Sequence, residues 1–128
     1  MASRAPVILD IFLKRDNDST TDFINRLKML TDDYQKELAL PGADRHSLKY
    51  KYAQALYLLD EERVATYQDI KVTFESSLQQ DLDDAGPLQR SEHLSANTAA
   101  LITYNENLHK NIERYSIAHR PVFDFIHK

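Results

Sequence analysis

The chain has 128 residues, of which 42% are hydrophobic and 28% charged, which predicts one soluble domain with a substantial core. It contains no cysteine, so disulfides, thiolate metal sites and a cysteine nucleophile are excluded. The formal net charge of −4 argues against a nucleic-acid partner bound over the whole surface.

Residues 1–18 include the apolar stretch APVILDIFLKR. This stretch is far shorter than the roughly 18 apolar residues that span a bilayer. It contains Asp10 and lacks a small-residue cleavage pattern, so we do not expect a signal peptide. Because its apolar residues leave no polar face, we expect 1–18 to pack on the bundle formed by 19–128 or on a partner.

A first helix is predicted over about 19–40. The preceding letters DNDSTTD, at 16–22, are typical of a helix start. Apolar residues then recur at steps of four and three, as expected for one buried helix face: Phe23, Leu27, Leu30, Tyr34 and Leu38. Pro41 and Gly42 end the pattern.

A long helix is predicted over about 44–84, because no glycine or proline occurs from 43 to 85. Asp44 is a suitable N-cap. The stripe contains one charged residue, within the letters DEER at 60–63, which lack turn chemistry. It consists of Leu48, Tyr52, Leu56, Leu59, Arg63, Tyr67, Ile70, Phe74, Leu78 and Leu82. One helix of roughly 60 Å is therefore expected.

A third helix is predicted from Pro87 to about His119, with Pro121 ending it and the apolar tail 122–128 docking back. Its seam alternates steps of four and three: Leu94, Thr98, Leu101, Asn105, Leu108, Ile112, Tyr115 and His119. The predicted fold is all-α: an elongated antiparallel bundle of three to four helices with one long central helix.

This layout places opposite charges at the two ends of the bundle. One end gathers the bases Lys36, Arg45, Lys49, Lys51, Arg120 and Lys128, and the other gathers the acids Glu75, Asp81, Asp83, Asp84 and Glu92. Bases at a helix start oppose the helix dipole unless an anion sits among them. We predict anionic-lipid binding by Arg45, His46, Leu48, Lys49, Tyr50 and Lys51. The alternative interpretation is a solvated basic face.

The sequence shows no catalytic or metal-binding motif. The five histidines form no i, i+4 pair, and the acids at 60–62 and 81–84 lack the spacing of a calcium loop, so we interpret them as solvated. A glycine-rich phosphate loop and a nucleophile elbow are also missing. A non-enzymatic protein without metal or cofactor is predicted.

A helical bundle with the basic and apolar tip RHSLKYK, at 45–51, resembles the four-helix membrane localisation domains of bacterial toxins and type III secreted effectors. The resemblance covers about 19–119 and implies phosphoinositide binding at the inner face of the host plasma membrane. The stretch VILDIFL is also similar to a chaperone-binding segment of secreted effectors, which implies a secretion chaperone bound at Val7–Leu13. Four-helix topology would need a break within 44–84, which the sequence lacks.

The alternative is a cytoplasmic protein–protein adaptor or chaperone-like bundle, for which self-association is one mode of interaction. For either hypothesis the chain is expected to be a monomer or a weak dimer. The adaptor would use the N-terminal apolar segment or the heptad seam of the third helix. An adaptor has no need for bases at the start of the long helix, so the basic tip distinguishes the two hypotheses.

Overall fold

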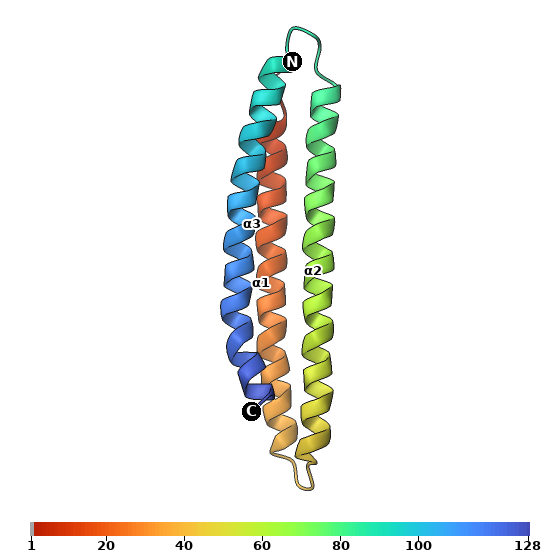
Figure 1. Cartoon of the computed structure of the whole chain (residues 1–128), viewed down its shortest axis with the longest axis vertical. Coiled ribbons are helices and arrows are strands. Elements are labelled where there is room, and N and C mark those ends of the chain that lie inside the picture. The colour runs from red at the N-terminus through yellow and green to blue at the C-terminus, as the bar shows by residue number, and fades with distance from the viewer. Residues whose placement is uncertain (1) are drawn as a thin grey trace.

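The computed structural model describes residues 2–128, which form three long helices: α1 (Ala5–Leu38), α2 (Arg45–Asp83) and α3 (Arg90–Ile126). Figure 1 shows them side by side in an elongated bundle, with α2 antiparallel to α1 and α3. The predicted all-α bundle is confirmed, with three helices in this part of the chain. We call the end with the α1–α2 loop and the end of α3 the lower end, and the other the upper end.

Helix α2 matches its prediction closely, because it is unbroken through the letters DEER. The Asp44 carboxylate caps it: Oδ1 accepts the backbone N–H of His46 at 3.0 Å and of Ser47 at 3.3 Å. Most of the buried residues of α2 belong to the predicted stripe, from Tyr52 onward, and they include the charged Arg63.

Helix α1 begins at Ala5, so the predicted helix start within 16–22 is wrong. The segment 1–18 supplies the first half of α1, and its buried Ala5 and Phe12 pack with residues of α2 and α3. The expectation that this segment has no solvent-facing side is also wrong, since Val7 and Ile11 are 63% and 50% exposed.

Asp16 and Thr20 belong to a buried polar layer across the middle of the bundle. Asp16 and Thr20 have no exposed surface. The Asn111 amide donates to Asp16 Oδ2, and Arg63 Nη2 donates to Thr20 Oγ1 at 3.2 Å. The Arg63 guanidinium also lies 5.5 Å from the Tyr67 ring centroid, where cation–π attraction offsets part of the cost of burial. These partners on α2 and α3 therefore allow α1 to bury Asp16 and Thr20, although both residue types favour helix N-caps.

Two apolar clusters flank this layer. The upper cluster contains Ala5, Phe12, Ile70, Phe74, Leu78, Ala100, Tyr104 and Leu108. The lower cluster contains Phe23, Leu27, Tyr34, Tyr52, Leu56, Leu59, Val122 and Ile126. Each cluster contains residues of all three helices, so the three helices pack together in both halves of the bundle.

Helix α3 starts at Arg90 and not at Pro87, and it continues past Pro121 to Ile126. The predicted end near His119 is therefore wrong. Proline removes one backbone donor, but the last turn still gains by burying Val122 and Ile126 in the lower cluster. The tail therefore docks on the bundle as expected, but it does so as the last turn of α3.

The predicted seam of α3 is displaced by one residue from its main buried row. That row includes His93, Asn97, Ala100, Tyr104 and Asn111, whereas Leu94 and Ile112 are 52% and 40% exposed. The polar members have partners: the Asn97 amide, for example, donates to the Leu78 carbonyl at 2.8 Å. The predicted seam follows the most apolar positions of α3, and these lie one residue away from the row that is mainly buried.

Candidate functional site

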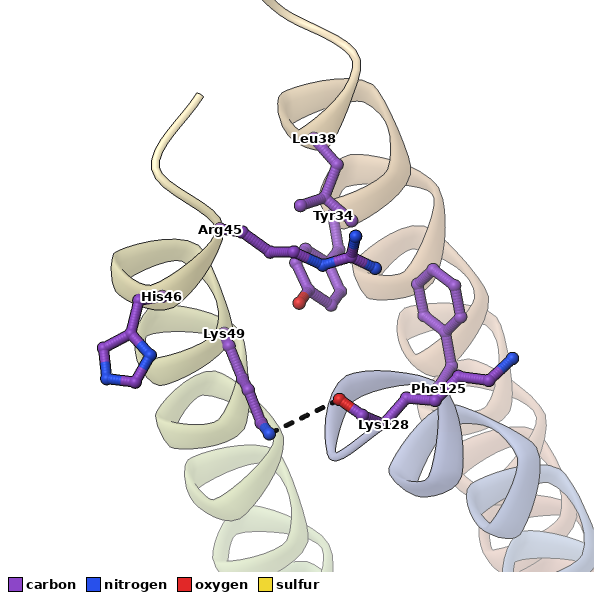
Figure 2. A pocket seen from close by; sticks show the side chains of 7 residues that line it. All are labelled: Tyr34, Leu38, Arg45, His46, Lys49, Phe125 and Lys128. Carbon is purple, nitrogen blue, oxygen red and sulfur yellow. Dashed lines mark hydrogen bonds between the residues drawn. The ribbon is translucent and has the colours of Figure 1, made fainter. Parts of the chain in front are cut away.

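The lower end contains a hollow of about 390 Å³ to which all three helices contribute. It lies where the end of α1, the start of α2 and the end of α3 meet (Figure 2). Its lining combines apolar and basic side chains: Tyr34, Leu38, Arg45, His46, Lys49, Phe125 and Lys128. An apolar base with a basic rim suits a ligand that carries both an anionic and an apolar part.

Aromatic contacts join the three helices at the base of the hollow. The Tyr34 ring stacks on Tyr52 of α2, with centroids 5.0 Å apart and planes 19° from parallel. Its other contact is edge-to-face with Phe125 of α3, at 5.3 Å. Tyr34 and Tyr52 are buried, so these ring contacts stabilise the packing of the three helix ends against one another.

Arg45 and Lys49 provide the positive charge, and their i, i+4 spacing puts them on one face of α2. Figure 2 shows Arg45 reaching from α2 toward Tyr34, and Lys49 pointing toward Lys128, whose carbonyl oxygen lies 3.5 Å from Lys49 Nζ. Within residues 2–128 the Arg45 side chain has no hydrogen bond or ion pair, which leaves all of its donors available.

The six residues predicted to bind lipid divide into three groups. Arg45, His46 and Lys49 line the hollow, although Figure 2 shows the His46 ring pointing away from the other side chains. Leu48 packs against the lower cluster instead. The remaining two lie outside the lining, Tyr50 at 73% exposure and Lys51 in an ion pair with Glu37.

The Lys51–Glu37 pair shows that part of the basic patch has a structural partner. Lys51 Nζ lies 3.0 Å from Glu37 Oε1, and this hydrogen bond raises the pKa of Lys51. Glu37 is in the last turn of α1. Because α1 and α3 both end here and only α2 begins here, two negative helix ends face one positive end, and bases are favourable at the lower end as a whole.

Three of the backbone N–H groups at the start of α2 are already paired within the protein. Asp44 already accepts those of His46 and Ser47, and the N–H of Leu48 donates to the Asp44 carbonyl at 3.0 Å. The hydrogen bonds from Ser47 and His46 also hold the pKa of Asp44 below its ordinary value, which keeps the cap ionised. An anion at this site would therefore be bound by side chains.

Sequence reasoning missed four residues of the lining as site residues: Tyr34, Leu38, Phe125 and Lys128. Tyr34 and Leu38 were assigned to the core stripe of α1, where they also belong. Phe125 reaches the hollow only because α3 continues through Pro121. The amphipathic spacing of Val122 and Ile126 was the available signal for that continuation.

The described chain shows neither a metal cluster nor a membrane-spanning helix. Across 2–128 there is no group of three or more His, Asp or Glu side chains placed to hold a metal ion. None of its helices has a long enough apolar stretch to cross a bilayer.

Comparison of the sequence with protein-family models, with curated proteins and with solved structures found no match.

Proposed function

We propose that the lower end binds the phosphate-bearing headgroup of anionic membrane lipids, phosphoinositides in particular, and so holds the protein at a membrane surface without catalysing a reaction. The observation that carries this proposal is the unpaired Arg45 beside Lys49 on the rim of a hollow with an aromatic base. A guanidinium with free donors binds phosphate oxygens in pairs, and a nearby ammonium adds charge.

The surroundings of the hollow suit a membrane interface. Leu40, in the α1–α2 loop, is 60% exposed, and Tyr50 is 73% exposed. Apolar and tyrosine side chains of this kind can enter the headgroup region while the bases meet the phosphates. Each base close to an anionic surface adds about 1 kcal/mol.

Our proposal includes the biological setting that the resemblance to bacterial toxin and type III effector domains implies. The protein would be the targeting domain of a secreted effector, peripheral on the inner face of the host plasma membrane. A secretion chaperone at Val7–Leu13 would have to bind side chains of α1 that stay outside the core, such as Val7 and Ile11.

A second candidate function is helix-mediated interaction with another protein. The exposed Leu94 and Ile112 of α3 favour it, because both belong to a heptad row that this chain leaves partly uncovered.

The test is co-sedimentation with vesicles of phosphatidylcholine alone, with phosphatidylserine, or with a few per cent phosphoinositide. The variant is Arg45→Ala with Lys49→Ala. The control, Lys28→Ala with Lys110→Ala, removes the same charge from exposed positions away from the lower end. Loss of two bases at about 1 kcal/mol each weakens binding roughly 30-fold. The control pair should change binding less than about threefold.

A soluble inositol phosphate, added as competitor, separates headgroup recognition from attraction to a charged surface. Competition at low concentration supports recognition in the hollow. The proposal fails if anionic vesicles do not bind the protein at low salt. It also fails if the control pair loses as much binding as the Arg45 and Lys49 pair.

A further inference from the structure

Two hollows, of about 270 Å³ and 240 Å³, lie along the boundary between α2 and α3, and their linings include no residue of α1. The first is lined by Asp60, Arg63, Val64, Tyr67, Ile112, Tyr115 and Ser116. The second is lined by Glu75, Leu78, Gln79, Leu82, Leu94, Asn97, Thr98 and Leu101. We call this surface the α2–α3 groove.

The heptad row of α3, which is the seam predicted from the sequence, runs along this groove. Leu94, Leu101 and Ile112 belong to the row and line the two hollows, and Leu94 and Ile112 are 52% and 40% exposed. Across the groove, Val64 of α2 is 47% exposed. A row of apolar residues at heptad spacing is the surface that a further helix packs against. Helix α3 thus carries a buried row and, beside it, this partly exposed heptad row, of which Leu108 is itself buried in the upper cluster.

We propose that a second copy of this chain docks on the α2–α3 groove, antiparallel to the first. The charge distribution of the bundle favours this occupant and this direction. Near the upper end the acids Glu75, Asp81, Asp83, Asp84 and Glu92 outnumber the bases Arg4, Lys71 and Arg90. Near the lower end the bases Lys36, Arg45, Lys49, Lys51, Arg120 and Lys128 exceed the acids Asp32, Asp33, Glu37, Asp44 and Asp124 by one. A parallel pair would place like charges together, and an antiparallel pair places each acidic end beside a basic end.

The available area agrees with a weak dimer. The 37 residues of α3 span roughly 55 Å, and a contact about one helix diameter wide covers roughly 500–600 Å² on each copy. The total of about 1,000–1,200 Å² lies at the lower limit of specific interfaces. Asn105, at the centre of the row, can pair with its own equivalent near a twofold axis and so favour one alignment.

The groove and the hollow at the lower end are different surfaces, so dimerisation and lipid binding can succeed or fail separately. Self-association is measured by sedimentation equilibrium from micromolar to several hundred micromolar protein at low salt. The groove variant is Leu94→Glu with Ile112→Glu. The matched control, Val72→Glu with Ile102→Glu, adds the same charge at side chains that are 63% and 56% exposed and outside both linings.

We expect the parent chain to approach twice the monomer mass, the groove variant to dimerise at least tenfold more weakly, and the control to change less than threefold. Helical circular dichroism shows whether each variant is folded. A parent chain that stays monomeric throughout overturns the proposal. So does a folded groove variant that dimerises as well as its control.

The absence of cysteine allows a direct test of direction. Thr98→Cys and Ser116→Cys lie on the α3 side of the groove, near opposite ends of the row. The two single variants are mixed and treated with a flexible bis-maleimide. An antiparallel dimer gives mainly mixed products that join position 98 to 116. Products that mainly join equal positions overturn the antiparallel arrangement.

Discussion

Asp81, in the last turn of α2, caps the start of α1 from across the bundle. Its Oδ1 accepts the backbone N–H of Arg4 at 2.8 Å, and its Oδ2 accepts the Ser3 hydroxyl at 2.8 Å. Ser3 Oγ in turn accepts the N–H of Ala5 at 3.1 Å. Arg4 has no side-chain cap of its own, so a carboxylate from another helix satisfies the first turn. Our interpretation of 81–84 as solvated acids is therefore wrong for Asp81, which is 2% exposed.

Replacing this carboxylate should destabilise the bundle. We expect Asp81→Asn to lower the free energy of unfolding at pH 7 by about 2 kcal/mol, because a buried charged acceptor of several hydrogen bonds is lost. Asp83→Asn, an exposed change two residues away, should cost less than about 0.5 kcal/mol. Urea unfolding followed by circular dichroism measures both. Equal values for the two variants would contradict the capping role.

The same variant has a predictable pH dependence. Burial raises the pKa of Asp81, but the hydrogen bonds from Arg4 and Ser3 and the nearby His93 outweigh it and hold the pKa below the ordinary 3.8. A carboxyl with a lowered folded pKa stabilises above the unfolded value and loses that contribution as pH falls through the folded value. The stability difference between parent and Asp81→Asn should therefore shrink below pH 3.8.

Asp16 should show the opposite sign. Burial raises the pKa of Asp16 above 3.8, although the Asn111 hydrogen bond and the Arg63 charge oppose this. The folded state then holds the proton more tightly, so stability falls as pH rises from 3.8 through the folded pKa. We expect Asp16→Asn, which mimics the protonated form, to raise the free energy of unfolding at pH 7 by about 1 kcal/mol.

The matched control for Asp16 is Asp18→Asn, an exposed change in the same helix that removes only the surface ion pair with Lys14. Its effect should stay below about 0.5 kcal/mol. Chemical denaturation at pH 4 and pH 7 makes the comparison. If Asp16→Asn clearly loses stability instead, and loses more at pH 7 than at pH 4, the predicted direction of the stability change is wrong.

The loop at the lower end depends on one glycine. Gly42 has a φ of 75°, a conformation that costs a residue with a Cβ atom roughly 1–2 kcal/mol, although an added Cβ would meet no atom within 4 Å. Gly42→Ala should therefore lower the free energy of unfolding by about 1 kcal/mol. Gly86→Ala, in the other loop, meets ordinary contact at 3.9 Å and should change stability much less. Thermal unfolding of both variants distinguishes backbone strain from a general effect of loop substitution.

The helix pattern in the sequence was most reliable where the core is apolar. The stripe of α2 was predicted through Arg63 because its neighbours at every step are large apolar residues. The start of α1 was missed because Asp16 and Thr20 look like capping residues, and only partners distant in the chain, Arg63 and Asn111, explain their burial. Local propensity does not contain that information.

The candidate site was predicted in part for a related reason. Arg45 and Lys49 could be found because bases at a helix start oppose its dipole. The partnership of Lys51 with Glu37, and the contribution of Phe125, depend on where the ends of α1 and α3 stop. Such positions follow from the helix boundaries. Caps and prolines placed the start of α1 about 14 residues too late and the end of α3 about seven residues too early.

The polar layer around Asp16 also determines how the three helices are aligned along their length. A slip of α1 by one turn, about 5.4 Å, would leave many leucines and phenylalanines facing other apolar residues at modest cost. It would also move Asp16 and Thr20 away from Asn111 and Arg63 and leave four polar side chains buried without these partners. The layer therefore fixes the alignment of the helices along their length, because it destabilises shifted packings that an entirely apolar seam would tolerate.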